Sequence, residues 1–265
     1  MEPRRFDVTG TLHLRLRLRS GDVRIRQTDE SGATVQVTGE READEISIEH
    51  DRTGSGDTRL QITQRKDGWA FRSRGIDVAI TVPQGSIVDL GTGSGDITVD
   101  GPVAELNVQT GSGDASVARV TGDARVRSAS GDVRVGTVDG NLTVTTASGE
   151  IEVGSVGGRF EGRSASGDIE IGTTTSTARA MSASGDIEFV SAGADLTLRS
   201  VSGDISVGVP AGTRVWFDVS STSGDTFSEL DTADGAGEAS FEIKATSVSG
   251  DIRIRRAPAP VGSRV

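Results

Sequence analysis

The residues with the most regular spacing in this chain are carboxylates. Each follows a Ser-Gly pair, and successive members recur with a constant 18-residue period. If such repeats stack at the strand spacing of about 4.8 Å, neighbouring carboxylates repel each other by roughly 1 kcal/mol at the dielectric of water, and a divalent cation would relieve the repulsion. This acidic row is therefore the first candidate for chemistry. Its members are Asp96, Asp114, Asp132, Glu150, Asp168, Asp186 and Asp204.

Calcium is the cation to consider for such a row. Calcium-binding β-roll repeats follow the pattern Gly-Gly-x-Gly-x-Asp and take ligands from two turns of each repeat. Here the acidic residue follows Gly directly, and the position nine residues later is not consistently acidic. Because calcium takes six to eight oxygen ligands, one turn alone makes a poor site. We expect no metal site and keep a calcium-binding β-roll as the first alternative. The second-turn positions are Glu105, Asp123, Asn141, Arg159, Thr177 and Asp195.

A catalytic constellation is not visible in the sequence. The chain has no cysteine, which excludes thiolate catalysis, disulfides and cysteine-based zinc sites. The two histidines, His13 and His50, lie outside the regular repeats and have no motif around them. Glycan-cleaving enzymes use paired carboxylates, but a repeat supplies such pairs everywhere and singles out none. We therefore expect no catalytic residue, no cofactor and no enzyme, and keep a polysaccharide-binding or glycan-cleaving solenoid as the second alternative.

Short alternating runs must position the acidic row. An apolar-polar-apolar run follows the acidic residue, as in Ile97-Thr98-Val99, and another follows nine residues later, as in Leu106-Asn107-Val108. This period of two is typical of a strand with one buried face. A fixed period without insertions indicates that each repeat is one rung stacked on the last. We predict an all-β, parallel, right-handed β-solenoid with 18-residue rungs of two short strands. Residue 97 then stacks on residues 115, 133, 151, 169, 187 and 205.

The corners of each rung have their own pattern. Glycine in the Ser-Gly-Asp phrase is expected because a corner between strands generally needs φ > 0, which glycine reaches without steric cost. Small apolar residues also recur in phase on either side of the acidic position. We interpret these as inward residues that fill the corners. They are Val120, Val138 and Val156 after the acidic position, and Ala129, Ala147, Ala165 and Ala183 before it.

The repeat loosens toward both ends of the chain. We expect irregular capping coils over residues 1–91, the regular array over 92–209, a second irregular cap over 210–254 and a disordered tail over 255–265, all in one continuous domain. Ser55-Gly56-Asp57 recurs once in the first cap and is interpreted as a further corner. Residues 65–69, ending in Trp69, are expected to form a hairpin or loop, and residues 231–238 an exposed loop. Further strands are expected at 33–38, 45–49, 59–63, 76–82, 215–219, 241–243 and 252–254.

A basic segment lies near the start of the chain. Leucines alternate with basic residues from Leu12 to Arg19, and Ser20-Gly21-Asp22 then turns the chain. One interpretation of the basic residues is a patch for a polyanion or a lipid headgroup. The other is a solvated strand face whose charges keep the first rung from pairing with another molecule. The residues expected on this face are His13, Arg15, Arg17, Arg19, Arg24 and Arg26.

Composition narrows the class of protein further. The net charge of −11 opposes non-specific binding to nucleic acid or to an anionic membrane. Aromatic residues make up 3% of the chain, which fits a thin core of Val, Ile, Leu and Ala. No apolar run approaches the roughly 20 residues that a membrane helix needs, and no secretion signal is visible. We expect a cytoplasmic protein, with peripheral membrane association as an option, and no nucleic-acid partner.

The repeated phrase carries a family resemblance. Ser-Gly-Asp-Ile recurring with an 18-residue period, preceded by Ile80-Thr81-Val82-Pro83-Gln84-Gly85-Ser86, resembles a bacterial family of unknown function. Its members are described as candidate adhesins or β-strand-repeat proteins, and the resemblance covers residues 8–254. It implies a β-solenoid and no established enzyme activity. Together with the uninterrupted repeat, it favours a non-catalytic scaffold or interaction module with an unidentified protein partner, as a monomer or small oligomer.

Overall fold

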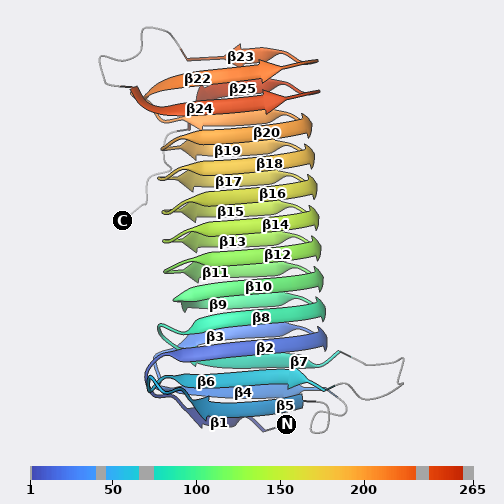
Figure 1. Cartoon of the computed structure of the whole chain (residues 1–265), viewed down its shortest axis with the longest axis vertical. Helices are drawn as coiled ribbons and strands as arrows, with labels where there is room; N and C mark the ends of the chain where they lie inside the picture. The colour runs from blue at the N-terminus through green and yellow to red at the C-terminus, as the bar shows by residue number, and fades with distance from the viewer. Residues whose placement is uncertain (1, 40–45, 66–74, 231–238, 259–265) are drawn as a thin grey trace. The chain divides into compact units, whose positions relative to one another are not determined.

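The computed structural model describes residues 2–39, 46–65, 75–230 and 239–258. The chain divides into two compact units, residues 1–140 and residues 141–265, and each is described by itself. Within the described residues all regular secondary structure is β-strand, and there is no helix (Figure 1). The expected division into caps and a regular array at residues 91 and 209 stays a prediction.

The first unit is a parallel β-solenoid over most of its length. One sheet has the strand order β1-β4-β7-β3-β9-β11-β13 and the other β12-β10-β8-β2-β6-β5. Ala115 pairs with both Ile97 and Val133, one repeat away on either side, so the expected register is confirmed within this unit. The strands are β1 (Arg4–Asp7), β2 (Leu12–Ser20), β3 (Val23–Thr28), β4 (Gly32–Thr38), β5 (Ile46–Arg52), β6 (Thr58–Gln64), β7 (Asp77–Pro83), β8 (Ile87–Ser94), β9 (Ile97–Val103), β10 (Glu105–Ser112), β11 (Ala115–Val120), β12 (Ala124–Ser130) and β13 (Val133–Val138).

The first coil of the chain is not the outermost one. Strand β2 pairs with β6 on one side and β8 on the other, and β3 likewise lies between β7 and β9. The first coil is thus inserted between the second and the third. The interpretation that the charges of β2 protect a free edge is therefore wrong, because both edges of β2 are hydrogen-bonded. All four neighbours are parallel, so the inserted coil continues the solenoid.

The outer strands of the first unit are antiparallel. β1 pairs with β4, β4 with β7, and β5 with β6. Ser55-Gly56-Asp57 lies in the turn between β5 and β6, where Thr53 N–H donates to Asp57 O at 2.8 Å. It is therefore a hairpin turn and not the solenoid corner that the sequence predicted. The corner of this coil is instead formed by Asp77, whose Oδ1 accepts the backbone N–H of Asp22 at 3.0 Å.

The second unit is also a parallel β-solenoid. One sheet has the order β15-β17-β19-β21-β25-β23 and the other β22-β24-β20-β18-β16-β14. Ile169 pairs with Ile151 and Ile187, as predicted. The strands are β14 (Leu142–Ser148), β15 (Ile151–Val156), β16 (Phe160–Ser166), β17 (Ile169–Thr174), β18 (Ala178–Ser184), β19 (Ile187–Ala192), β20 (Leu196–Ser202), β21 (Ile205–Val209), β22 (Arg214–Ser221), β23 (Thr226–Ser228), β24 (Ala239–Ser247) and β25 (Ile252–Arg256).

The last coil in sequence is again an inner coil. β24 lies between β20 and β22, and β25 lies between β21 and β23. The outermost strands are therefore β22 and β23, which precede the last coil. Arg255 and Arg256 belong to β25. The disordered tail predicted from residue 255 therefore does not include these two residues. Trp69 and the loop expected at residues 231–238 lie outside the described residues.

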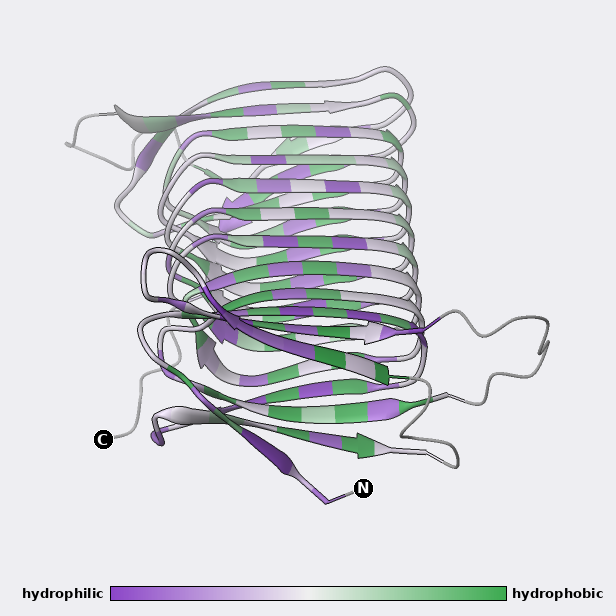
Figure 2. Ribbon diagram, turned by 60° about the horizontal axis from the view of Figure 1, so that its bottom comes forward, coloured by the Kyte–Doolittle hydropathy of each residue, from purple (hydrophilic) through white to green (hydrophobic). Residues whose placement is uncertain are grey.

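Inward side chains form the core of each unit. Hydrophobic and hydrophilic residues alternate along the strands (Figure 2), and the apolar positions point between the two sheets. Ile169 is 1% exposed between its stacked neighbours. In the same unit, Phe160 and Phe189 are fully buried with ring centroids 6.3 Å apart in an edge-to-face arrangement. Because aromatics are scarce, aliphatic stacking supplies most of the buried apolar area.

The corner alanines do not fill the core. Val120, Val138 and Val156 are buried as predicted, whereas Ala129, Ala147, Ala165 and Ala183 are exposed, so that part of the interpretation is wrong. The alternation of inward and outward side chains continues to the end of each strand. The hydroxyl residue directly before each of these alanines therefore points inward instead. Ser182 Oγ and Ser200 Oγ each donate to a corner glycine carbonyl at 3.3 Å, which satisfies a buried polar group. The inward hydroxyl residues are Thr92, Thr110, Ser128, Thr146, Ser164, Ser182, Ser200 and Ser247.

Glycine is required at the corners for two physical reasons. Gly131 has φ of 134°, a conformation that side chains rarely adopt, and a Cβ there would lie 2.3 Å from Gly113 O. Gly203 has φ outside the left-handed region, yet its Cβ would still lie 2.2 Å from Gly185 O. The close approach of consecutive corners therefore requires glycine at both positions, whereas the positive φ that the sequence predicted holds only at the first.

Candidate functional site

The acidic row forms a hydrogen-bonded ladder at the corner in each of the two units. In the first unit, Asp96 Oδ1 accepts the backbone N–H of Asp114 at 2.9 Å, and Asp114 Oδ1 accepts that of Asp132 at 2.9 Å. The ladder begins with Asp77 and Asp22, the latter accepting the N–H of Asp96 at 2.9 Å. Each carboxylate thus satisfies a backbone donor of the next rung, which explains why a short acidic side chain follows the glycine.

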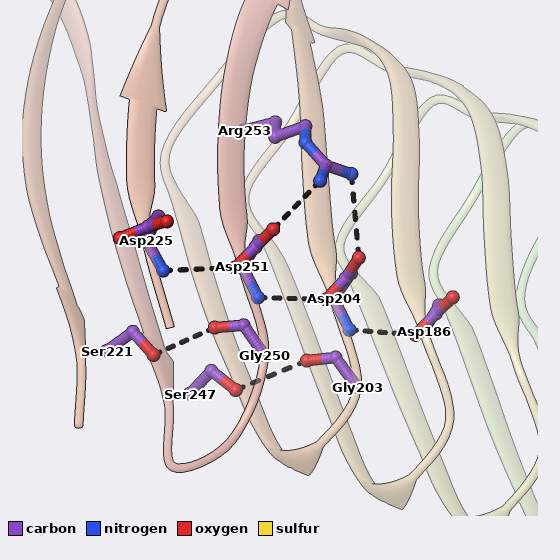
Figure 3. A network of polar contacts seen from close by, with 9 residues as sticks. All are labelled: Asp186, Gly203, Asp204, Ser221, Asp225, Ser247, Gly250, Asp251 and Arg253. Atoms are coloured by element: carbon purple, nitrogen blue, oxygen red, sulfur yellow. Dashed lines mark hydrogen bonds and ion pairs between the residues drawn. The ribbon is translucent and has the colours of Figure 1, made fainter. Parts of the chain in front are cut away.

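The second unit repeats this arrangement. Asp168 Oδ1 accepts the N–H of Asp186 at 2.8 Å, and Asp186 Oδ1 accepts that of Asp204 at 2.7 Å. Asp204 then accepts from Asp251 at 2.8 Å, and Asp251 from Asp225 at 3.0 Å, which follows the spatial order of the coils (Figure 3). The ladder therefore passes through residues that are far apart in sequence.

Arginines two residues after the corner offset part of the acidic charge. Arg253 Nη2 lies 2.8 Å from Asp251 Oδ2, and its Nη1 lies 3.5 Å from Asp204 Oδ2 (Figure 3). In the first unit Arg134 lies 3.1 Å from Asp132 and 4.0 Å from Asp114. Each arginine bridges two rungs and offsets the repulsion between the two carboxylates that it contacts.

The geometry of the ladder limits its use as a metal site. Successive carboxylates come from a single corner, and in most of them one oxygen already accepts a backbone N–H. These are Asp22, Asp77, Asp96, Asp114, Asp168, Asp186, Asp204 and Asp251. Within the described residues, no group of three or more His, Asp or Glu side chains is arranged to hold a metal ion. The ladder is therefore a structural feature of the corner.

The outer face of one sheet in the second unit is rich in carboxylates. Glu170 on β17 pairs in register with Glu152 on β15 and with Glu188 on β19. These side chains point away from the core beside the corner ladder, and Arg255 forms an ion pair with Glu188. Like charges directly opposite each other repel, and the ion pair with Arg255 offsets this repulsion at Glu188. We call Glu152, Glu170 and Glu188 the glutamate row.

The other sheet of the second unit has a mixed outer face. Arg163, Arg179 and Arg199 are exposed on β16, β18 and β20, and Glu161 pairs with Arg163 at 2.5 Å. A hollow of about 320 Å³ on this face is lined by residues from β16, β18, β20 and β24, among them Arg179 and Lys244. The two outer faces of the unit therefore differ in charge, a difference that the sequence analysis did not identify. The alternation of apolar and acidic residues along β15, β17 and β19 could have revealed this difference.

The basic residues near the start of the chain do not share a face. Arg15, Arg17 and Arg19 lie on β2, and Arg24 and Arg26 lie on β3, which belongs to the other sheet. Each group also has an acidic neighbour, so the predicted single basic face is wrong. On the sheet of β3, Asp100 Oδ2 lies 3.8 Å from Arg26 Nε and 4.0 Å from Arg24 Nε.

Asp89 is the acidic neighbour on the sheet of β2. Its Oδ2 lies 2.8 Å from Arg17 Nη2 and 3.0 Å from Arg15 Nε, and Asn107 Nδ2 donates to its Oδ1 at 2.7 Å. Partial burial opposes ionisation of this carboxyl, but hydrogen bonds from Arg17 and Asn107 and the charge of Arg17 outweigh burial. The pKa of Asp89 is therefore lowered. The aspartate links three strands, β2, β8 and β10.

The comparisons with known proteins agree with this geometry. Residues 12–255 match the family model described as Toastrack DUF4097. The chain belongs to the Toastrack DUF4097 family. This finding confirms the resemblance that the repeated corner phrase carries, and the family is one of unknown function. No curated protein matches the chain.

Solved structures from other bacteria are similar to this chain. A candidate adhesin from Bacteroides fragilis superposes with a TM-score of 0.53 at 14% identity, covering 95% of each chain. A candidate adhesin from Parabacteroides distasonis covers 95% of each chain at 10% identity, with a TM-score of 0.39 that supports no argument. At these identities the first likeness establishes a shared fold and nothing about ligands.

The histidines of this Toastrack chain do not form a site. His13 lies on the outer face of β2, and His50 lies at the end of the core on β5. His50 contacts the ring of Phe6, and its Nε2 lies 3.1 Å from Asp7 O, so a packing role accounts for it. Among the described residues, no helix is long and apolar enough to cross a membrane.

Proposed function

We propose that this Toastrack protein is a non-catalytic interaction scaffold that binds a protein partner through the outer faces of its sheets. The observation that carries the proposal is the glutamate row on β15, β17 and β19, held in register on a regular parallel sheet. Stacked carboxylates cost stability, so a binding role gives a reason to retain them. A partner with a basic surface matches this face.

The shape of the face supports recognition of a macromolecule. The rungs of β15, β17 and β19 follow each other at a constant repeat length, with no loop inserted between them. Their outer side chains therefore form rows on a flat surface, and a flat surface suits a protein partner better than a small molecule, which needs a concave site. Placement in the cytoplasm, with peripheral membrane association, stays a prediction that cell fractionation would test.

The test compares two variants that change opposite faces of the same unit. Changing Glu152, Glu170 and Glu188 together to Gln removes three charges from the acidic face. Changing Arg163, Arg179 and Arg199 together to Gln removes three charges from the other sheet and serves as the control. We expect affinity capture from the native cell to recover a defined partner with wild type and with the control, and to lose it with the glutamine variant of the glutamate row. The capture should also weaken as salt increases.

Two results would count against the scaffold. Equal recovery of the partner by both variants would remove the assigned face. Release of a defined glycan product from polysaccharide, abolished by changing one carboxylate, would establish the glycan-cleaving alternative instead.

A further inference from the structure

The outer end of the second unit exposes large apolar residues at a free sheet edge. On β22, Trp216 is 70% exposed and Phe217 is 40% exposed, and Phe227 on β23 is 53% exposed. Both strands are edge strands, and within the described residues nothing pairs with their outer sides. A free edge with exposed aromatics is a ready template for another strand.

The side chains of β22 form the last layer of the core. Val215, Phe217 and Val219 pair in register with Phe241, Ile243 and Ala245, whose side chains are buried. They therefore point inward, and no further coil among residues 75–230 and 239–258 covers them. On the outer side of the same strand lie Arg214, Trp216 and Asp218. Asp218 pairs in register with Lys244, and neither Arg214 nor Asp218 has an ion pair within 4.0 Å among the described residues.

The outer end of the first unit is built differently. Its edge strands, β1 and β5, are antiparallel to their neighbours and carry mostly polar and charged residues. The Phe6 and His50 rings lie 5.4 Å apart and join the two edge strands over the end of the core. Charged residues on short antiparallel edges oppose further pairing. The two outer ends are thus not complementary to each other, which disfavours a head-to-tail filament.

The sequence of β22 is complementary to itself. If two copies meet in antiparallel fashion with Trp216 opposite its counterpart, Arg214 of each copy lies opposite Asp218 of the other. In the same register Val215 lies opposite Phe217, so apolar residues meet apolar residues on the inner side. Opposite charges and apolar pairs facing each other across strands both favour pairing. A two-fold axis perpendicular to the two sheets produces this arrangement and also brings β23 beside its counterpart.

We propose that two copies of this chain associate through β22 and β23 into a closed two-fold dimer, with Arg214 of each copy paired to Asp218 of the other. The inference goes beyond the proposed scaffold function, because it uses the end of the second unit and not its outer faces. The 8 residues of β22 span about 26 Å, so the two ends bury roughly 1,000 Å² in total, near the lower limit of specific interfaces. The dimer is therefore reversible and depends on concentration.

The test uses charge reversal on the full chain, followed by sedimentation equilibrium and light scattering from roughly 1 to 200 µM. Wild type is expected to shift from monomer to dimer over this range. Arg214→Asp and Asp218→Arg each place like charges opposite each other and should raise the dimer Kd at least about tenfold. The Arg214→Asp/Asp218→Arg double variant restores opposite charges and should return close to the wild-type Kd. A mixture of the two single variants should form heterodimers.

Controls separate this interface from non-specific association. Arg127→Asp makes the same charge change at an exposed position of β12, and Val201→Ala removes an exposed apolar side chain away from the edge; neither should change the Kd. Melting curves establish that each variant is folded. A chain that stays monomeric throughout, that forms open-ended oligomers, or whose dimer is indifferent to the two reversals would overturn the proposal.

Discussion

The backbone N–H of Asp204 donates to Asp186 Oδ1 at 2.7 Å, which links two successive corners of the second unit. The contact assigns the acidic residue a structural role. Asp186→Asn keeps an oxygen acceptor and should melt close to wild type, whereas Asp186→Ala leaves the N–H of Asp204 without its acceptor and should cost about 1 kcal/mol. Chemical denaturation of both variants measures the difference. Equal stability of Asn and Ala variants would show that the hydrogen bond contributes nothing.

Calcium should have no effect on folding. Ladder carboxylates such as Asp96, Asp168 and Asp186 each have one oxygen occupied by a backbone donor. Calcium requires six to eight oxygen ligands. We expect the same melting temperature with calcium and with a chelator, and no binding heat on calorimetric titration. A large loss of stability on adding chelator would instead support the calcium-binding β-roll.

The stacked isoleucines should tolerate no charge. Ile169→Asp places an unpaired carboxylate between Ile151 and Ile187, and the expected loss is several kcal/mol, on the order of 3–5. Glu170→Ala, on the exposed side of the same strand, is the control and should change stability little. Equilibrium unfolding compares the two variants. Similar midpoints would mean that the inward and outward faces of β17 are assigned incorrectly.

The corner glycine should be far less replaceable than its neighbour. Gly131→Val forces a β-branched residue into positive φ and places its Cβ against Gly113 O, 2.3 Å away. We expect a loss above about 2 kcal/mol, against a few tenths for Ser130→Ala at an exposed position. Thermal melts of the two variants provide the measurement. A valine variant as stable as the alanine variant would contradict the close approach of the corners.

Asp89 should make stability depend on pH. Its pKa is lowered in the folded protein, so its contribution is fully present above the unfolded value near 3.8 and is lost as pH falls through the folded pKa. Asp89→Asn should therefore lower the free energy of unfolding by about 1 kcal/mol near neutral pH. The difference in this free energy between the variant and wild type should become smaller as the pH falls below about 4. Unfolding is measured at a series of pH values.

Asp139→Asn is the matched control for Asp89. It breaks a more exposed ion pair, in which Arg119 Nη2 lies 2.8 Å from Asp139 Oδ2. Exposed pairs are screened by solvent, so we expect a smaller loss. If the difference in unfolding free energy between wild type and Asp89→Asn is independent of pH, the carboxylate charge does not stabilise the fold.

The sequence alone determined the regular part of each unit. An unbroken 18-residue period leaves one way to stack the rungs, and alternation of period two decides which side chains face inward, so the stack of Ile151, Ile169 and Ile187 could be predicted. The same alternation predicts Ser182 inward and Ala183 outward. The prediction that alanine fills the corner was wrong because it was based on the small size of the residue. The two-residue period of the strand instead decides which way the side chain points.

Only the tertiary structure decided the order of the terminal coils and which residues far apart in sequence share an outer face. Where the spacing breaks, several pairings satisfy the same alternation, and the chosen one inserts β2 between β6 and β8 and β24 between β20 and β22. Partners far apart in sequence, such as Arg17 with Asp89, then share a face, whereas Arg17 and Arg24 are separated by the corner between two sheets. Sequence spacing carries no record of such pairings, because they follow from long-range hydrogen bonding between strands.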